Sequence, residues 1–223
     1  MLPKTDLNYR QYKLTMLVIA FLGSLLIFAS FILKKQTLFL LLNGDMGAAA
    51  DAFFKYFTHV GDGLFWFLWL PLVVIKRGKK YLPLLLSAIV FSTLLTQISK
   101  QVIYPDEPRP LQAIADQTLV HYVQGVTIHS INSFPSGHTA TAFSFLLILS
   151  LFNKSSRWIV LGFAIALLVA YSRIYLGQHF PLDVGAGMLV AVGTMLLSVM
   201  VQKRFENITA ESTENRGPKK SGL

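Results

Sequence analysis

The chain has 223 residues, of which 53% are hydrophobic and only 14% are charged, and its formal net charge is +9. Soluble domains carry about a quarter charged residues, so this composition indicates an integral membrane protein and argues against a soluble enzyme. The absence of cysteine excludes disulfides, thiolate metal sites and a cysteine nucleophile. The positive-inside rule of membrane proteins explains the net charge better than nucleic-acid binding does, so we expect no nucleic-acid partner.

Six apolar segments follow one another along the chain. A membrane-spanning helix needs about 20 mostly apolar residues, with about 17 as the lower limit. The first, third and sixth segments reach this length, the fourth and fifth reach it only with their polar ends, and the second is interrupted by His59, Gly61 and Asp62. The sequence therefore predicts an all-α fold, a six-span transmembrane helical bundle. The segments are Leu14–Leu33, Phe53–Ile75, Tyr81–Ser99, Thr139–Phe152, Trp158–Ala170 and Val184–Val201.

The basic residues predict how this bundle lies in the membrane. Of the 20 lysines and arginines, 14 fall in the N-terminal segment, the Lys76–Lys80 and Lys154–Arg157 loops and the C-terminal tail. In a six-span drawing these four regions share one side, which the positive-inside rule assigns to the cytoplasm together with both termini. We expect one integral-membrane domain over residues 1–204 and, from its polar composition, a disordered cytoplasmic tail over residues 205–223.

Two basic residues mark the loop that follows the third segment. Lys100 ends that segment, and Arg109 stands between Pro108 and Pro110 on a stiff backbone. A guanidinium offers planar paired donors that match phosphoryl oxygens, so Arg109 is a candidate phosphate clamp. A membrane-interface anchor for Lys100 and an ordinary turn around Arg109 are the alternative interpretations.

The fourth segment begins at Pro135-Ser136-Gly137-His138. Serine is a favoured N-cap, and the free N–H groups of a helix start bind anions, which glycine lets approach closely. On these four residues alone, an ordinary capped helix with a histidine in its first turn is the favoured interpretation.

The last polar cluster runs from Ser172-Arg173 to His179 and Asp183. Pro181 suits the first position of a helix, which places Asp183 in the first turn and His179 just before it. Asp183 can accept the proton of one ring nitrogen of His179, leaving the other nitrogen free to attack phosphorus. The alternatives are a carboxylate that only complements the helix dipole and an arginine that only anchors the membrane interface.

The six-span drawing brings these candidates to one side of the membrane, away from the cytoplasm. We therefore expect one active site at the outer membrane face. We interpret His59, Asp62, His121 and His129 as solvated loop residues, and no spacing indicates a magnesium or nucleotide site, so the expected chemistry needs no metal or cofactor. The residues that converge are Lys100, Arg109, Ser136, His138, Arg173, His179 and Asp183.

These motifs resemble the type 2 phosphatidic acid phosphatase superfamily, whose signature has three blocks: K-x6-R-P, P-S-G-H and S-R-x5-H-x3-D. Residues 135–138 match the second block in full and residues 172–183 match the third. The first block departs from the pattern, because eight residues instead of six separate Lys100 from Arg109.

The resemblance implies roles for the matched residues. His179 resembles the nucleophile that forms a phosphohistidine, Asp183 its orienting partner, and His138 the general acid that protonates the leaving oxygen and later activates water. The implied phosphate-binding residues are Lys100, Arg109, Ser136, Gly137 and Arg173.

The implied function is metal-independent dephosphorylation of a membrane lipid phosphate or pyrophosphate at the outer face of a bacterial cytoplasmic (inner) membrane. Undecaprenyl pyrophosphate, phosphatidylglycerol phosphate and phosphatidic acid are the expected substrates, and the sequence leaves the choice among them and the oligomeric state open. The alternatives are a lipid phosphotransferase or lipid A phosphatase that uses the same phosphohistidine, and a non-catalytic lipid-binding membrane protein. The family's soluble vanadium haloperoxidases do not fit the membrane composition.

Overall fold

The computed structural model describes residues 7–214, and these residues form helices and loops without a β-strand. Short 3₁₀ turns and one π-helical turn (η4) connect the α-helices. The elements are α1 (Tyr9–Ile32), α2 (Lys35–Leu42), α3 (Ala48–Phe57), η1 (Thr58–Gly61), η2 (Gly63–Phe65), α4 (Trp66–Arg77), η3 (Lys79–Tyr81), α5 (Leu82–Ile98), η4 (Ser99–Ile103), α6 (Pro110–Ala113), η5 (Gln117–Leu119), α7 (Gly137–Phe152), α8 (Ser156–Tyr175) and α9 (Pro181–Glu214).

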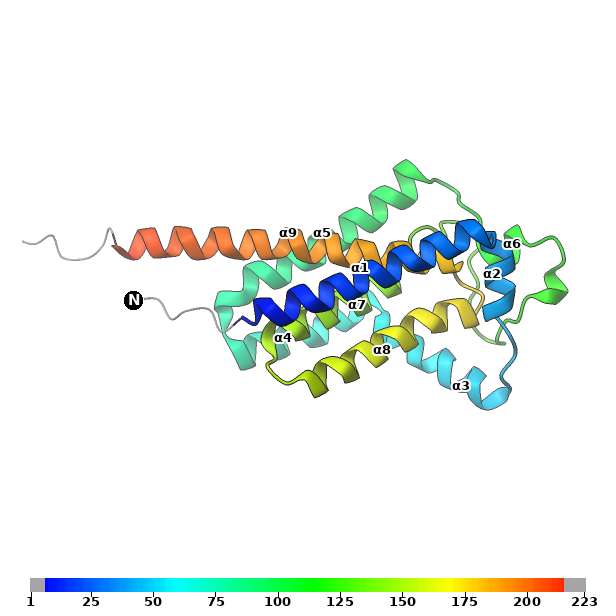
Figure 1. The fold of residues 1–223 in the computed structure, drawn as a ribbon, viewed down its shortest axis with the longest axis horizontal. Helices are drawn as coiled ribbons and strands as arrows, with labels where there is room; N and C mark the ends of the chain where they lie inside the picture. The colour runs from blue at the N-terminus through cyan, green and yellow to red at the C-terminus, as the bar shows by residue number, and fades with distance from the viewer. Residues whose placement is uncertain (1–6, 215–223) are drawn as a thin grey trace, which may run out of the picture.

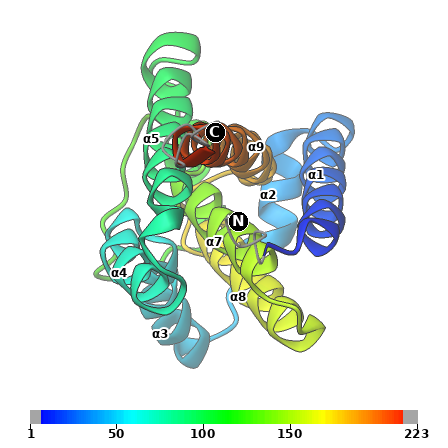
Figure 2. The same ribbon diagram turned by 90° about the vertical axis from the view of Figure 1, so that its left-hand side faces the viewer.

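Helix α7 lies at the centre of the bundle. Viewed along the long axis, it is surrounded by α1, α5, α8 and α9, and it contacts all four (Figure 2). Of its 16 residues, 13 are buried, whereas α1 exposes large apolar side chains such as Phe21 and Phe28 on its outer side. An apolar outer surface of this extent is typical of helices that face lipid.

Glycines bring α9 close to its neighbours near the start of the helix. A Cβ added at Gly185 would lie 2.7 Å from the carbonyl oxygen of Gly23 in α1. A Cβ added at Gly187 would lie 2.6 Å from the carbonyl oxygen of Ser136, directly before α7. Small residues allow backbones to approach in this way in membrane bundles, and here they fix the start of α9 against the start of α7.

The helices agree in part with the six predicted spans. Four helical stretches are long and apolar enough to cross a membrane, and a fifth is obtained if the bent pair Ala48–Gly61 and Gly63–Arg77 counts as one span. The remaining predicted segment corresponds to α7, an apolar helix of 16 residues. The structure thus supports an all-helical bundle with four or five candidate spans among the described residues.

The second predicted segment breaks at the residues that interrupt its apolar run. Its two halves meet at an angle of 55° around η1 and η2. Gly61 sits in this break between α7 and α8, where an added Cβ would lie 2.5 Å from Val169 Cγ1 and 2.9 Å from the carbonyl oxygen of His138. The bend therefore packs η1 directly against the start of α7.

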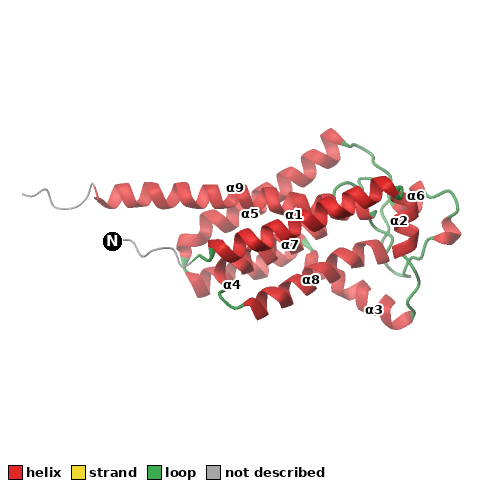
Figure 3. Cartoon of the chain, in the orientation of Figure 1, coloured by secondary structure: helices red, strands yellow, loops and turns green. Residues whose placement is uncertain are grey.

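The two ends of the bundle differ in character. At one end, on the left of Figure 1, α1 begins, α7 ends and α9 continues outward; the Asn8 amide donates to the Leu151 carbonyl there over 2.7 Å. At the other end lie α2, α6 and the long irregular connections, as Figure 3 shows. The starts of α7 and α9 and the end of α8 face this loop-rich end.

The predicted disordered tail is corrected in its first part, because α9 is helical as far as Glu214. A hydrogen bond of 2.8 Å from Gln202 Nε2 to Glu206 Oε1, one helical turn further on, supports this continuation. The rest of the predicted tail, residues 215–223, lies outside the described residues.

Candidate active site

A cleft of about 440 Å³ opens at the loop-rich end of the bundle. Its lining residues come from α3 and η1, from the π-helical turn η4 after α5, from the loops on either side of α6, from the start of α7, from the end of α8 and from the connection to α9. The structure thus gathers candidates that lie up to 79 positions apart in the sequence. The predicted residues in its lining are Lys100, Arg109, Gly137, His138, Arg173 and His179.

Arg109 is buried and held by main-chain oxygens. Its Nε donates to the Ile131 carbonyl over 3.0 Å, and its Nη1 donates to both the carbonyl and the side-chain oxygen of Gln178 over 3.1 and 3.0 Å. Gln178 in turn donates to the Thr127 carbonyl. These contacts fix the guanidinium beside His179, which directly follows Gln178 in the chain.

Arg173 occupies the last turn of α8 and is also buried. Its Nη1 donates to Thr58 Oγ1 over 2.7 Å, which connects it to η1. Its Nε is buried without a hydrogen-bond partner among the described residues. A buried guanidinium with a free donor at a cleft wall is well suited to bind a phosphoryl oxygen.

Asp183 lies behind His179, and both side chains are 2% exposed. His179 Nδ1 is 3.6 Å from Asp183 Oδ2, a close polar contact that is longer than a hydrogen bond. The same Oδ2 accepts hydrogen bonds from the Ser133 hydroxyl and, over 2.9 Å, from the Phe180 amide. The carboxylate is therefore oriented toward Nδ1, and Nε2 is the ring nitrogen left for the cleft.

The start of α7 has the geometry that its sequence predicts. Ser136 is the N-cap, and its side chain accepts a hydrogen bond from the Thr139 amide. The Ser136 amide donates to the Asp183 carbonyl over 3.0 Å, which ties α7 to α9. A Cβ at Gly137 would contact only Thr96 Cγ2, at 3.7 Å, among the protein atoms, so the packing of the protein alone does not require glycine there. Close approach of a bound anion would require it.

The cleft is strongly cationic. Lys100 lines it from the π-helical turn η4, a kind of turn that is frequent at functional sites. Burial, followed by the positive charges of Arg109, Arg173 and Lys100, holds the pKa of His179 well below its usual value. The imidazole is therefore neutral at neutral pH, as a nucleophile must be.

Three polar residues interpreted as solvated loop residues also line this cleft: His59, Asp62 and His129. Lys55 joins them from α3. The structure also adds Ser133, Thr58 and Gln178, which the sequence analysis did not select. No sequence spacing links Ser133 or Thr58 to the two histidines. Gln178 could have been selected from the sequence, because it directly precedes His179.

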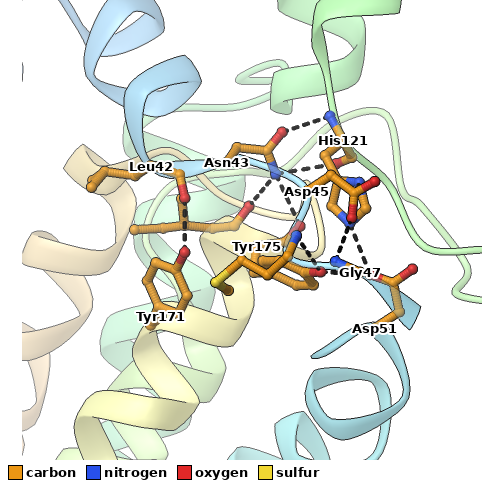
Figure 4. A network of polar contacts seen from close by, with 10 residues as sticks. Leu42, Asn43, Asp45, Gly47, Asp51, His121, Tyr171 and Tyr175 are labelled. Carbon is orange, nitrogen blue, oxygen red and sulfur yellow. Dashed lines mark hydrogen bonds and ion pairs between the residues drawn. The ribbon is translucent and has the colours of Figure 1, made fainter. Parts of the chain in front are cut away.

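His121 lies outside the cleft, in the polar network of Figure 4. Its Nε2 is 3.0 Å from Asp51 Oδ1, which also accepts a hydrogen bond from the Tyr175 hydroxyl over 2.6 Å. Asn43 Nδ2 donates to the Ile174 and Tyr175 carbonyls at the end of α8, each over 2.9 Å.

Asp45, Asp51 and His121 could in principle hold a cation, since they place one ligand atom each within 4.8 Å of one another. Polar contacts already engage all three groups, because Asp45 Oδ1 accepts from the Gly47 amide, and Asp51 Oδ1 accepts from the Tyr175 hydroxyl and lies 3.0 Å from His121 Nε2. The network therefore acts as a brace for the turn that carries Arg173.

Comparison with known proteins finds similarity over most of the chain. The model of the PAP2 superfamily matches residues 80–207. An undecaprenyl-diphosphatase from Sulfolobus acidocaldarius is 30% identical over 169 residues, which cover 74% of this chain and 77% of the relative. A phosphatidylglycerophosphatase B from Haemophilus influenzae is 36% identical over 89 residues, 36% of each chain. The crystal structure of Aquifex aeolicus LpxE superposes with a TM-score of 0.63 and 34% identity, covering 73% of this chain and 93% of that one.

Proposed function

The chain belongs to the PAP2 superfamily and is a lipid phosphate phosphatase, and on this basis we propose that it removes a terminal phosphate from a membrane lipid through a phosphohistidine on His179. The observation that carries the mechanism is the convergence of His138, His179 and the cationic side chains on one cleft. In the first step Nε2 of His179 forms a bond to phosphorus while the bond from phosphorus to the lipid oxygen breaks. His138 gives its proton to that oxygen, and the dephosphorylated lipid leaves.

The second step reverses these roles. His138 takes a proton from water, the resulting hydroxide attacks phosphorus, and the bond to Nε2 breaks. Phosphate departs and His179 is restored, while Asp183 keeps Nδ1–H oriented throughout. Water and the two histidines thus account for every proton, and no metal ion is needed.

Charge stabilisation is assigned to the cationic wall of the cleft. A phosphoryl group in transfer spreads negative charge over its equatorial oxygens, so fixed donors around it lower the barrier. Arg109 and Arg173 are buried and held by Gln178 and Thr58, and therefore need little reorganisation. Lys100, Ser136 and Gly137 complete the proposed phosphate-binding shell.

The proposed substrate is a lipid pyrophosphate such as undecaprenyl pyrophosphate, the activity for which the Sulfolobus relative is named. A glycerophospholipid phosphate such as phosphatidylglycerol phosphate or phosphatidic acid is the second candidate, in line with the name of the Haemophilus relative. We place the chain in a bacterial inner membrane with six spans and cytoplasmic termini. The loop-rich end, which carries the cleft, then faces outward at the level of the lipid headgroups.

The test is initial-rate phosphate release in detergent from undecaprenyl pyrophosphate, phosphatidylglycerol phosphate, phosphatidic acid and lipid A. We expect turnover that persists in EDTA, is blocked by orthovanadate and disappears in His179→Ala. An alkaline quench during turnover of labelled substrate should trap phosphohistidine in the wild type only. Magnesium-dependent activity, or an active His179→Ala protein, would contradict the mechanism.

The same assay distinguishes the competing functions. Label that passes from one lipid to another, without free phosphate, would identify a phosphotransferase. Binding of lipid phosphates without release of phosphate from any of them would identify a non-catalytic lipid-binding protein.

A further inference from the structure

We propose that the cleft has a second anion subsite, formed by Lys55 and His59, that binds the lipid-side phosphate of a diphosphate substrate. This inference rests on the proposed function, because it uses the assigned role of His138. It goes further by identifying the residues that make the cleft prefer a lipid diphosphate to a monophosphate.

The side chain of Lys55 is held in place by a hydrogen bond to the backbone. It lies in the last turn of α3 and lines the cleft, and its Nζ donates to the Gln124 carbonyl over 3.0 Å. Gly125 makes room for the ammonium group, since a Cβ there would lie 2.7 Å from Nζ, and its φ of +73° also favours glycine. A lysine ammonium has three donors, so this one hydrogen bond leaves two N–H groups for a ligand.

The position of η1 defines the side of the cleft on which this subsite lies. His59 belongs to η1, and Gly61 of the same turn packs directly on the backbone of His138. Lys55 precedes His59 by four positions, about one helical turn. His59 therefore lies on the His138 side of the cleft, and Lys55 lines the same cleft one turn earlier in the chain. His138 is assigned to protonate the leaving oxygen, so the leaving group lies on this side.

The leaving group differs between the two substrate classes. When the terminal phosphate of a lipid diphosphate is transferred, the leaving group is a lipid monophosphate and carries charged oxygens. When a lipid monophosphate is the substrate, the leaving group is an uncharged alcohol. A lysine beside the leaving group therefore stabilises only the first.

The charges of the lining agree with two phosphates. Lys100, Arg109 and Arg173 line the cleft and are assigned to one phosphoryl group, and Lys55 adds a further cation to the lining. Asp62 is the only acidic side chain among the described lining residues. Asp62 Oδ1 accepts a hydrogen bond from the Leu64 amide, and Asp62 Oδ2 lies 4.0 Å from His59 Nδ1. Both oxygens of this carboxylate therefore have partners within residues 59–64.

The first test uses soluble anions and does not depend on catalysis. Calorimetry would give the Kd of methylenediphosphonate and of orthophosphate for the wild type, Lys55→Gln and His59→Asn. We expect the wild type to bind the diphosphonate more tightly than orthophosphate. The ratio of the two Kd values should shrink about tenfold in Lys55→Gln and by a smaller factor in His59→Asn. Lys34→Gln is the matched control, because Lys34 is an exposed lysine outside the cleft.

The second test compares farnesyl pyrophosphate with farnesyl phosphate, which share one prenyl tail. The ratio of their kcat/KM values should fall about tenfold in Lys55→Gln and stay at the wild-type value in Lys34→Gln. Unchanged ratios and unchanged anion preference in Lys55→Gln would overturn the subsite while leaving the proposed function intact. Loss of anion preference in a protein that hydrolyses neither lipid would support the subsite and overturn the proposed function.

Discussion

At the scale of single residues, the orientation of Asp183 depends on more than the histidine it faces. One of its oxygens accepts hydrogen bonds from Ser133 and Phe180 and lies 3.6 Å from His179 Nδ1. Ser133 is fully buried and stands outside the signature blocks. We infer that it is a positioning residue, which holds the carboxylate that orients the nucleophile.

Replacing Ser133 with alanine should lower kcat about tenfold with little change in KM, because the lost hydrogen bond orients Asp183 and does not bind substrate. Ser133→Thr, which keeps a hydroxyl, should recover most of the rate. Ser150→Ala is the matched control, since Ser150 is a buried serine whose hydroxyl donates within its own helix. Equal losses in Ser133→Ala and Ser133→Thr would show that packing, not the hydrogen bond, matters at this position.

Asp183→Asn should reduce kcat by about three to four orders of magnitude while the protein stays folded, because an amide cannot hold the His179 tautomer that leaves Nε2 bare. Phosphate release and the thermal unfolding midpoint would be measured together. Asp116→Asn, at an exposed carboxylate on the loop side, should keep the wild-type rate. An Asp183→Asn protein within tenfold of wild type would contradict the assigned role.

The buried imidazole of His179 should make the folded state sensitive to acid. Its pKa is held well below the usual value in the folded protein and returns to about 6.5 on unfolding. Below about pH 6.5 the unfolded chain binds a proton that the native state excludes, so stability falls by up to about 1.4 kcal/mol per pH unit from this group. Above that pH both states are neutral and this contribution is constant.

The measurement is the unfolding midpoint in detergent between pH 7.5 and 5. Acidification should lower the midpoint of the wild type more than that of His179→Gln. His129→Gln, at an exposed histidine of the cleft rim, should retain the slope of the wild type. Identical slopes for the wild type and His179→Gln would contradict a neutral buried His179.

At the scale of elements, the broken helix α3–η1–η2–α4 is the part that completes the cleft wall. Its bend inserts η1 between α7 and α8, where Thr58 accepts a hydrogen bond from Arg173. The insertion is possible because Gly61 has no side chain to collide with Val169 or with the carbonyl of His138. A continuous helix would carry Thr58 and His59 away from the cleft.

Gly61→Ala should therefore destabilise the fold by about 1–3 kcal/mol and lower activity, because the added methyl group meets a backbone oxygen that cannot move aside easily. Gly63→Ala is a close control, since a Cβ at Gly63 meets nothing within 4 Å. Chemical or thermal unfolding of the two variants in detergent, with phosphate release, compares them directly. Equal stability of the two variants would show that η1 is not tightly inserted.

At the scale of the whole molecule, the chain has a basic end and a loop-rich end. The start of α1 and the far part of α9 share one end of the bundle (Figure 1), and the residues that line the cleft lie at the other. The basic loops Lys76–Lys80 and Lys154–Arg157 belong to the first end. The positive-inside rule then predicts that this end is cytoplasmic and that the cleft faces outward.

Cysteine labelling can test this orientation cleanly, because the chain contains no cysteine. A cysteine at Gln117, exposed at the loop-rich end, should react with an impermeant maleimide in intact cells. A cysteine at Ser155, exposed between α7 and α8, should react only after the cells are permeabilised. The reverse pattern would invert the topology, and labelling of both from one side would contradict a membrane-crossing bundle between them.

The membrane setting, the helical class and the motifs at residues 135–138 and 172–183 follow from the amino-acid sequence alone. These features are local: apolar runs of helical length, and capped helix starts at Ser136 and Pro181, depend on neighbouring residues only. The break in the second predicted span is local in the same way, because His59, Gly61 and Asp62 interrupt an apolar run of the sequence. The six-span count remains a prediction, because length and composition identify α7 only as a shorter apolar helix.

The packing of the helices brings together the residues that complete the site from distant parts of the chain. It places Lys100 beside Arg109 despite their longer spacing, joins Ser133 to Asp183 and Thr58 to Arg173, and adds Lys55 to the lining. The polar composition of residues 205–214 predicted disorder, whereas α9 continues through them. Contacts between residues 50 or more positions apart, such as Ser133 with Asp183, depend on how the helices pack, and local sequence patterns do not encode that packing.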